Sequence, residues 1–310
     1  MTFTAPLQAF AYWEKNTPNQ LMFHQPFIKG PVKMSYKEAG IEIRKMAQAL
    51  INLNYAPKSK IALLSKNCSH WIMADLAIQM AGHISVPIYP TINADSIAQI
   101  MTHSESKAVI IGKLDNYDTQ KSGLKDSIKI GIKAYQIEEK LSWEDMVESN
   151  EALEELPEQK AEDLLTIMYT SGTTGSPKGV MHSVGSFTAV TNTAVKAIGL
   201  NTKKPRFFSY LPLTHIAERI GIEMFGLYQG GSFNFPFSIE TFADDLAATQ
   251  PDLFFAVPRI WTKFQDSILN TIPQKKLNIL LKIPVLNGII RKKIKKKLGL
   301  LDTQAIFTGA

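Results

Sequence analysis

Short apolar segments alternate with amphipathic segments along this sequence, and this alternation most limits its possible folds. The pattern predicts strands at residues 60–64, 84–88 and 108–111 and helices at 35–54, 69–81 and 94–103. The first helix has a clear start, because Ser35 and Glu38 form a capping-box pattern ahead of apolar residues at helical spacing. Repeated strand–helix units predict an α/β protein with mainly parallel sheets covered by helices.

The alternation continues through the second half of the chain. We expect strands at 164–168, 179–182, 207–211, 253–257 and 304–307, and helices at 184–198, 216–228 and 258–270. Residues 201–205 have the composition of a junction between two units. We therefore predict two subdomains of the αβαβα type, one at residues 45–200 and one formed by residues 1–44 with 201–310.

Composition and charge narrow the class of protein. The 310 residues are 45% apolar, enough for a large core, and the single cysteine, Cys68, excludes an internal disulfide framework and fits a reducing compartment. We find no secretory signal and no apolar segment of membrane-spanning length, so we expect a cytoplasmic protein. Residues 138–163 are acidic, and the helix expected after Ser142 is interpreted as a solvated surface helix and linker.

Residues 169–180, with the sequence YTSGTTGSPKGV, follow the apolar strand at 164–168 directly. A strand that opens into such a loop offers unpaired backbone N–H groups, hydroxyls and the Lys178 ammonium, as a polyphosphate requires. A turn or flexible linker is the alternative. The loop is not a Walker A motif, because Pro177 precedes Lys178 and Gly179 follows it.

The order of residues in this loop, S-G-T-T-G-x-P-K-G, closely resembles the phosphate-binding signature of the adenylate-forming (AMP-binding) superfamily. That superfamily includes acyl-CoA synthetases, luciferases and adenylation domains. Two more stretches, LPLTHIAER at 211–219 and VPRIWTKF at 257–264, resemble the long-chain fatty acyl-CoA synthetases. Weaker similarities lie at 71–91, at 141–146 and in the final IFTGA. The resemblance covers most of the chain, but only the first half or slightly more of the family's full length.

The resemblance implies roles for individual residues. The phosphates of ATP would be held by Thr170, Ser171, Gly172, Thr173, Thr174, Gly175 and Lys178. Thr170 and Lys178 would be the catalytic residues, and Thr170 would also contribute to a partial Mg²⁺ site. His215 would line the acyl pocket and Trp261 would gate it. In the family's reaction a fatty acid carboxylate attacks the α-phosphate of ATP, and the thiol of coenzyme A then attacks the acyl-adenylate.

Some of the family's motifs cannot be located in these 310 residues. They are the glutamate that completes the magnesium site, the ribose-binding aspartate, the hinge and the catalytic lysine of the C-terminal lid domain. We therefore expect an incomplete large domain, the N-terminal portion of a longer ligase without its lid domain, that is inactive by itself. Two other functions stay open, namely an adenylating ligase for another carboxylic acid and a non-catalytic lipid- or nucleotide-binding module.

Alternative interpretations apply to the two motifs after residue 210. His215 and Arg219 are four residues apart, which would place them on one helix face, but composition alone favours a capped helix start with a surface pair of Glu218 and Arg219. Trp261 would by default be a core aromatic residue. A zinc site is not expected, because the sequence has no cysteine pair and no HExxH motif.

The net charge of +6 comes from one part of the chain. Residues 275–297 contain nine Lys or Arg and no acid, and a basic run at 291–297 follows an apolar stretch that Pro284 and Gly288 interrupt. We favour a solvated helix face for this run. The alternative is a peripheral contact with the inner face of an anionic membrane. Nucleic-acid binding is not expected, because the run lacks interleaved aromatic residues.

Overall fold

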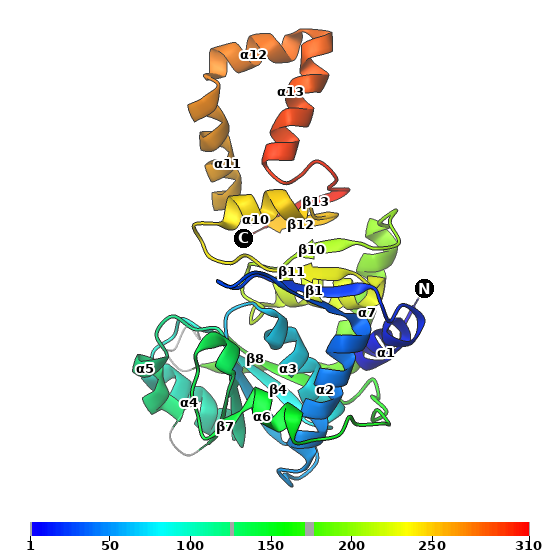
Figure 1. Ribbon diagram of the computed structural model, residues 1–310, viewed down its shortest axis with the longest axis vertical. Helices are drawn as coiled ribbons and strands as arrows, with labels where there is room; N and C mark the ends of the chain where they lie inside the picture. The colour runs from blue at the N-terminus through cyan, green and yellow to red at the C-terminus, as the bar shows by residue number, and fades with distance from the viewer. Residues whose placement is uncertain (1, 125–126, 171–176, 310) are drawn as a thin grey trace.

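The computed structural model describes residues 2–124, 127–170 and 177–309, whose strands form two sheets (Figure 1). Six described strands form sheet A, in the order β13 (Ala305–Thr308), β12 (Leu253–Ala256), β10 (Arg206–Phe208), β11 (Ser232–Asn234), β1 (Leu21–Gln25) and β2 (Val32–Ser35). Seven described strands form sheet B, in the order β7 (Leu141–Ser142), β6 (Ile128–Gly131), β5 (Ala108–Ile111), β3 (Lys60–Leu64), β4 (Ile84–Ile88), β8 (Leu164–Thr170) and β9 (Lys178–Ser183).

Both sheets are mainly parallel, as the alternation predicts. In sheet A only β1 and β2 pair antiparallel, and in sheet B only β8 and β9 do so, within the residues described. The predicted strands at 60–64, 84–88 and 108–111 match β3, β4 and β5 residue for residue. The α/β class is therefore confirmed.

Helices lie between the two sheets and on their outer faces. The elements packed in the main core are α1 (Pro6–Asn16), α2 (Tyr36–Ile51), α3 (Ser69–Met80), α6 (Trp143–Glu148), α7 (Val184–Ile198), the π-helical η3 (Arg219–Met224) and α9 (Phe225–Gln229). The remaining helical elements are α4 (Ala94–Ser104), α5 (Tyr117–Gln120), η1 (Lys121–Leu124), η2 (Lys133–Tyr135), α8 (Ile216–Glu218), α10 (Phe242–Thr249), α11 (Pro258–Thr271), α12 (Gln274–Lys282) and α13 (Pro284–Lys297).

Side-chain alternation along the strands explains this layering. In β3, Ile61 belongs to the core between the sheets, whereas Ala62 belongs to the outer core under α4. In sheet A, Phe207 faces the central core and Phe208 joins an outer cluster with Leu246 of α10. Because successive side chains of a strand point to opposite faces, each sheet buries both of its faces. The result is the predicted αβαβα layering.

Helix α2 shows how local sequence sets an element boundary. The Ser35 hydroxyl accepts a hydrogen bond from the Glu38 N–H at 3.2 Å, and the Glu38 carboxylate accepts one from the Ser35 N–H at 2.8 Å. This is the predicted capping box, and it satisfies N–H groups that the first turn leaves unpaired. The buried residues Ala39, Ile43 and Met46 then face the core.

Two predictions need correction. The acidic segment is not a purely solvated helix, because Trp143 of α6 is only 1% exposed and its indole N–H donates to Glu42. Gly288 does not interrupt the last helix, because α13 begins at Pro284 and continues through Gly288 to Lys297. Among the described residues, no helix has both the length and the apolar character needed to cross a membrane.

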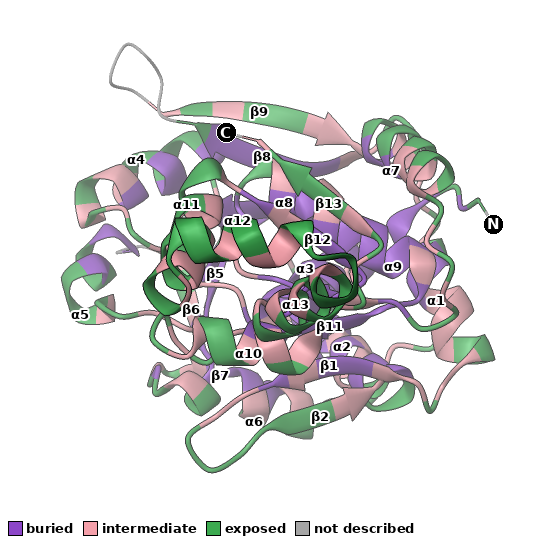
Figure 2. Cartoon of the chain, turned by 90° about the horizontal axis from the view of Figure 1, so that it is seen from above, coloured by how far each residue is buried: buried purple, intermediate pink, exposed green. Residues whose placement is uncertain are grey.

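Helices α11, α12 and α13 project beyond sheet A as a helical extension, residues 258–297 (Figure 1). None of these helices contains a buried residue. The extension carries only exposed and intermediate colouring in Figure 2, whereas the body has a buried interior. The extension is therefore a surface structure along its whole length.

Candidate functional site

The predicted phosphate loop connects β8 to β9. These strands pair antiparallel up to the loop, with Thr170 opposite Lys178 in the last pair. Strand β8 also runs parallel to β4, so Thr170 lies at the carboxyl edge of sheet B. Ligands of open parallel sheets bind at this edge. The predicted residues Ser171, Gly172, Thr173, Thr174 and Gly175 lie outside the described part of the chain.

Thr170 and Lys178 form the mouth of this loop. Because directly opposed residues in an antiparallel pair project from the same face, the two side chains start from neighbouring positions on one face of the hairpin. Both residues are exposed, so both groups are available to a ligand above the strand ends. The structure thus brings together the two described members of the predicted phosphate site.

Buried contacts anchor the base of this hairpin. Tyr169 is 4% exposed, and its hydroxyl is 2.7 Å from Nδ1 of His103 on α4. Opposite Tyr169, a Cβ on Gly179 would lie 2.8 Å from the Ile167 side chain and 3.1 Å from the Tyr169 ring. Close packing therefore favours glycine at position 179, because a larger residue would displace the Ile167 or Tyr169 side chain.

His215 lies on a second strand-to-helix connection, after β10. It is exposed and caps α8, with its Nδ1 accepting a hydrogen bond from the Ala217 N–H at 3.2 Å. Asn67, which follows β3 of the other sheet, holds this connection by donating to the Leu211 carbonyl at 2.6 Å and accepting from the Leu213 N–H at 3.1 Å. The carboxyl ends of β3 and β10 therefore meet at one place.

Arg219 has a different position from the one that its spacing predicts. It is fully buried, whereas His215 is exposed, so the two residues do not share a face. The guanidinium lies 2.5 Å from the Asp75 carboxylate and 2.7 Å from that of Glu223, and it stacks over the Trp71 ring at 4.9 Å. Burial raises the pKa of Glu223 well above its ordinary value, and the guanidinium opposes this shift.

Glu218 is buried as well, so the surface pair with Arg219 that composition favoured is wrong. One carboxyl oxygen accepts hydrogen bonds from the Ser209 hydroxyl and from the Tyr210 N–H, both at 2.9 Å. Burial raises the pKa of Glu218 to about 8, and these two hydrogen bonds act in the opposite direction. Glu218 is thus neutral over most of the pH range below 8, and it ties the end of β10 to α8.

The sequence contains a signal for the buried ion cluster that the predictions missed. Asp75 is the charged residue of the run WIMADLAIQMA, which is apolar apart from Asp75 and Gln79, and all but one residue of α3 are buried. A carboxylate in such a helix requires a buried partner, because an isolated charge is costly to remove from water. Gln79, one turn away, donates to one carboxylate oxygen at 2.6 Å, but the cationic partner, Arg219, comes from 144 residues further along the chain, so local patterning does not identify it.

Trp261 lies on α11, which follows β12, the neighbour of β10 in sheet A. It is half-buried, and its ring meets Phe254 edge-on at 5.7 Å and Phe264 at 5.8 Å. Tyr210 stacks on the same Phe254 at 5.9 Å. Trp261 is therefore part of an aromatic cluster at the carboxyl ends of β10 and β12.

The described residues supply little of a metal site. No group of three or more His, Cys, Asp or Glu side chains gathers into a metal-binding arrangement in the part of the chain that the structure describes. Thr170 contributes one exposed hydroxyl at the loop mouth. Since protein-bound Mg²⁺ usually has one or two carboxylate ligands besides phosphate and water, Thr170 fits only as part of such a site.

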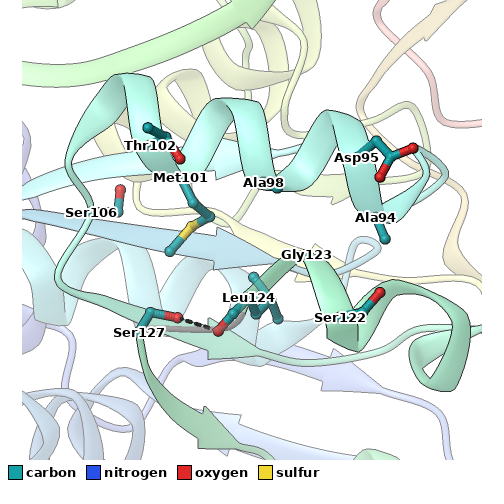
Figure 3. Close-up of a pocket in the computed structure, with 10 residues that line it drawn as sticks. All are labelled: Ala94, Asp95, Ala98, Met101, Thr102, Ser106, Ser122, Gly123, Leu124 and Ser127. Atoms are coloured by element: carbon teal, nitrogen blue, oxygen red, sulfur yellow. Dashed lines mark hydrogen bonds between the residues drawn. The ribbon is translucent and has the colours of Figure 1, made fainter.

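A pocket of about 340 Å³ lies between α4 and the segment that includes η1 (Figure 3). Its lining is made of small, hydroxyl and apolar side chains with one carboxylate, namely Ala94, Asp95, Ala98, Met101, Thr102, Ser106, Ser122, Gly123, Leu124 and Ser127. None of these residues belongs to the predicted phosphate or acyl sites. We assign no ligand to this pocket.

Most of this chain, including the β8–β9 hairpin, matches a known protein family. The sequence model of the family described as AMP-binding enzyme matches residues 10–292. The chain belongs to the AMP-binding enzyme family. The resemblance found in the loop sequence is thereby confirmed, and the matched region includes both Thr170 and Lys178.

Individual relatives of this AMP-binding enzyme chain agree with that assignment. Long chain acyl-CoA synthetase 5 of Arabidopsis thaliana is 31% identical over 271 residues, which cover 80% of this chain and 40% of the relative. The probable CoA ligase CCL6 of Humulus lupulus is 29% identical over 290 residues, covering 83% and 43%. The N-terminal domain of FACL13 from Mycobacterium tuberculosis has the same fold, with a TM-score of 0.74, 21% identity and coverage of 99% of this chain and 70% of that one.

The chain matches only part of these relatives. In eight curated relatives, the aligned segments make up 38% to 51% of the relative's full length.

Proposed function

We propose that this chain is the phosphate- and acid-binding part of an ATP-dependent ligase that converts a long-chain fatty acid to its acyl-CoA. The reaction has two steps. The carboxylate attacks the α-phosphate of ATP and releases pyrophosphate, and the thiol of coenzyme A then attacks the acyl-adenylate and releases AMP. This chemistry requires positioning of phosphates and neutralisation of charge more than a protein nucleophile.

The observation that carries this proposal is the pairing of Thr170 with Lys178 at the mouth of the β8–β9 loop. The Lys178 ammonium would neutralise phosphate charge, and the Thr170 hydroxyl would donate to a phosphate oxygen or contribute one ligand to Mg²⁺. Each charge-assisted contact of this kind is worth roughly 1.5 to 3 kcal/mol. Backbone N–H groups and hydroxyls of residues 171–175 complete the proposed phosphate site.

Calorimetric titration of the 310-residue chain with ATP and Mg²⁺ tests the phosphate site. Lys178→Ala should weaken binding by between about ten- and a hundredfold, because one charge-assisted contact is lost. Lys196→Ala removes another exposed lysine, from α7, and should leave the affinity unchanged. Equal affinities for the two variants would remove the loop from its assigned role.

The choice of a long-chain acid rests on the connections after β10 and β12. His215 and Trp261 follow these adjacent parallel strands, and the intervening aromatic cluster supplies an apolar surface suited to an alkyl chain. Similarity to the long chain acyl-CoA synthetase of Arabidopsis supports the same substrate class. Trp261→Ala should therefore alter the dependence of turnover on chain length more than it alters the affinity for ATP.

We further propose that turnover belongs to a longer protein, because the aligned part of the curated relatives is 38% to 51% of their length. The test compares acyl-AMP formation from palmitate and ATP by the 310-residue chain and by the whole reading frame that contains it. We expect turnover only from the latter. Higher turnover with short, aryl or amino acids would favour another adenylating ligase, and binding without adenylation by the whole protein would favour a binding module.

A further inference from the structure

The helical extension, residues 258–297, carries a dense group of positively charged side chains. Residues 275–297, which make up nearly all of its last two helices, contain nine Lys or Arg and no acidic residue. All nine are exposed: Lys275, Lys276, Lys282, Arg291, Lys292, Lys293, Lys295, Lys296 and Lys297. The remaining chain carries a net charge of −3, since the whole has +6 and this segment contributes +9.

The same helices expose large apolar side chains. Ile279 of α12 is 63% exposed, and Val285 and Ile289 of α13 are 75% and 59% exposed. Ile283 and Leu286, in the same part of the extension, are also exposed. These five residues lie on both sides of the connection between α12 and α13, at the far end of the extension (Figure 1). An apolar corner of this kind is unfavourable in water, which points to a partner.

The exposed apolar side chains are not the ones that pack α12 against α13, because a second set of apolar residues does this. Leu277, Leu280 and Ile290 are only partly exposed, and they lie on α12 and α13, which contact each other. The packing between the two helices is therefore already supplied by other side chains. The exposed corner is additional to it, and no described residue covers it.

The distances along α13 between its exposed apolar residue Ile289 and its basic residues match the depth of the layers at a bilayer surface. At about 1.5 Å per residue, Lys297 lies roughly 12 Å along the helix from Ile289, and Arg291 only about 3 Å from it. Helices at a bilayer surface insert apolar side chains about 5 to 10 Å into the boundary between headgroups and acyl chains. With the corner inserted, the basic run would lie within about one Debye length, roughly 10 Å, of the headgroup phosphates.

Other partners fit this surface less well. A second copy of the chain would bring two strongly basic surfaces together. Single-stranded nucleic acid is bound through aromatic stacking, and residues 272–297 contain no aromatic side chain. An anionic bilayer matches both properties at once, because it offers negative headgroups directly above an apolar layer.

We propose that the helical extension docks on an anionic lipid surface, with Ile279, Val285 and Ile289 inserted and the basic run of α13 at the headgroups. This inference goes beyond the proposed ligase function, because it concerns a surface outside the phosphate and acyl sites. It replaces the interpretation of residues 291–297 as a merely solvated helix face, on the basis of the exposed apolar corner beside them.

The test is sedimentation of the 310-residue chain with lipid vesicles. Binding should occur with vesicles that contain phosphatidylserine, and should be weak or absent with phosphatidylcholine alone. Changing the five lysines of the basic run, Lys292, Lys293, Lys295, Lys296 and Lys297, to glutamine should weaken binding at least about tenfold. Val285→Ser with Ile289→Ser should also weaken binding, and because all these side chains are exposed, the fold should survive in both variants.

A matched control distinguishes this surface from general attraction by positive charge. It changes five exposed lysines elsewhere, Lys33, Lys37, Lys107, Lys196 and Lys203, to glutamine. This control should bind phosphatidylserine vesicles much more tightly than the variant of the basic run. Equal loss in both variants, or no binding by the unmodified chain, would overturn the proposal. So would a dimer in solution that dissociates on the Val285 and Ile289 changes while vesicle binding stays unaffected.

Discussion

Replacing Glu218 with glutamine should change how the stability of this chain depends on pH. The carboxyl group is 1% exposed and ties α8 to the end of β10 through hydrogen bonds from Ser209 and Tyr210. Glutamine has nearly the same shape, and its amide oxygen can accept both hydrogen bonds. The substitution therefore removes the ionisable proton and leaves the local geometry intact.

The magnitude follows from the raised pKa of this carboxyl. Burial raises the pKa of Glu218 from its ordinary value of 4.5 to about 8 in the folded chain. Because the folded state holds the proton more tightly, the stabilising contribution is complete below pH 4.5 and is lost as pH rises toward 8. A tenfold change in proton affinity corresponds to about 1.4 kcal/mol, so the total loss is on the order of 4 to 5 kcal/mol as an upper bound.

The assay is urea unfolding of the unmodified chain and of Glu218→Gln between pH 5 and pH 8, the interval between the ordinary and the raised pKa of this carboxyl. The free-energy difference between the two proteins should increase in favour of the variant by about 1.4 kcal/mol per pH unit. Titration of other groups cancels in this difference, and Glu162→Gln, at an exposed carboxyl, is the control that should show no trend. A pH-independent difference for Glu218→Gln would refute the reasoning.

Two further substitutions, one in the buried ion cluster and one in the hairpin, can be tested by thermal or urea unfolding. Arg219→Met leaves the carboxylate of Asp75 buried without its cation, and should lower the free energy of unfolding by about 3 to 5 kcal/mol. Lys58→Met breaks an exposed ion pair and should cost under about 1 kcal/mol, so equal losses would contradict the burial argument. Gly179→Ala places a methyl group against the Tyr169 ring and should cost about 1 to 3 kcal/mol; an unchanged melting temperature would show that the hairpin relaxes freely.

Much of sheet B could be predicted because each strand contains its own signal. Strands β3, β4 and β5 are short, mostly apolar runs with both faces buried, in which the polar residues are Lys60 at the start of β3 and Ser85 in β4. Strands β1 and β2 were not predicted, because their own sequences lack a clear apolar pattern. They contain His24, Gln25 and Lys33, and neither their pairing with each other nor the pairing of β1 with a strand 210 residues away is encoded locally.

In the candidate site, too, local features could be predicted from the sequence and features set by distant residues could not. The order of residues around Lys178 was enough to predict the family, because the motif is local. The environments of Glu218 and Arg219 were not predictable from the same stretch, since burial depends on Asp75 and Asn67 from the other half of the chain. Strand β10 also ends at Phe208, earlier than expected, because the Tyr210 N–H donates to Glu218 instead of to a neighbouring strand.

The position of β1 within sheet A affects how the chain can fold during its synthesis on the ribosome. Phe23 of β1 pairs with Phe233 of β11, so the first strand has no parallel neighbour until about 200 more residues have been made. At roughly 5 to 20 residues per second, this delay is about 10 to 40 s. Sheet B, whose strands all lie between Lys60 and Ser183, can form during that interval. The N-terminal hairpin would meanwhile expose Met22 and Phe23, which are both fully buried in the folded chain.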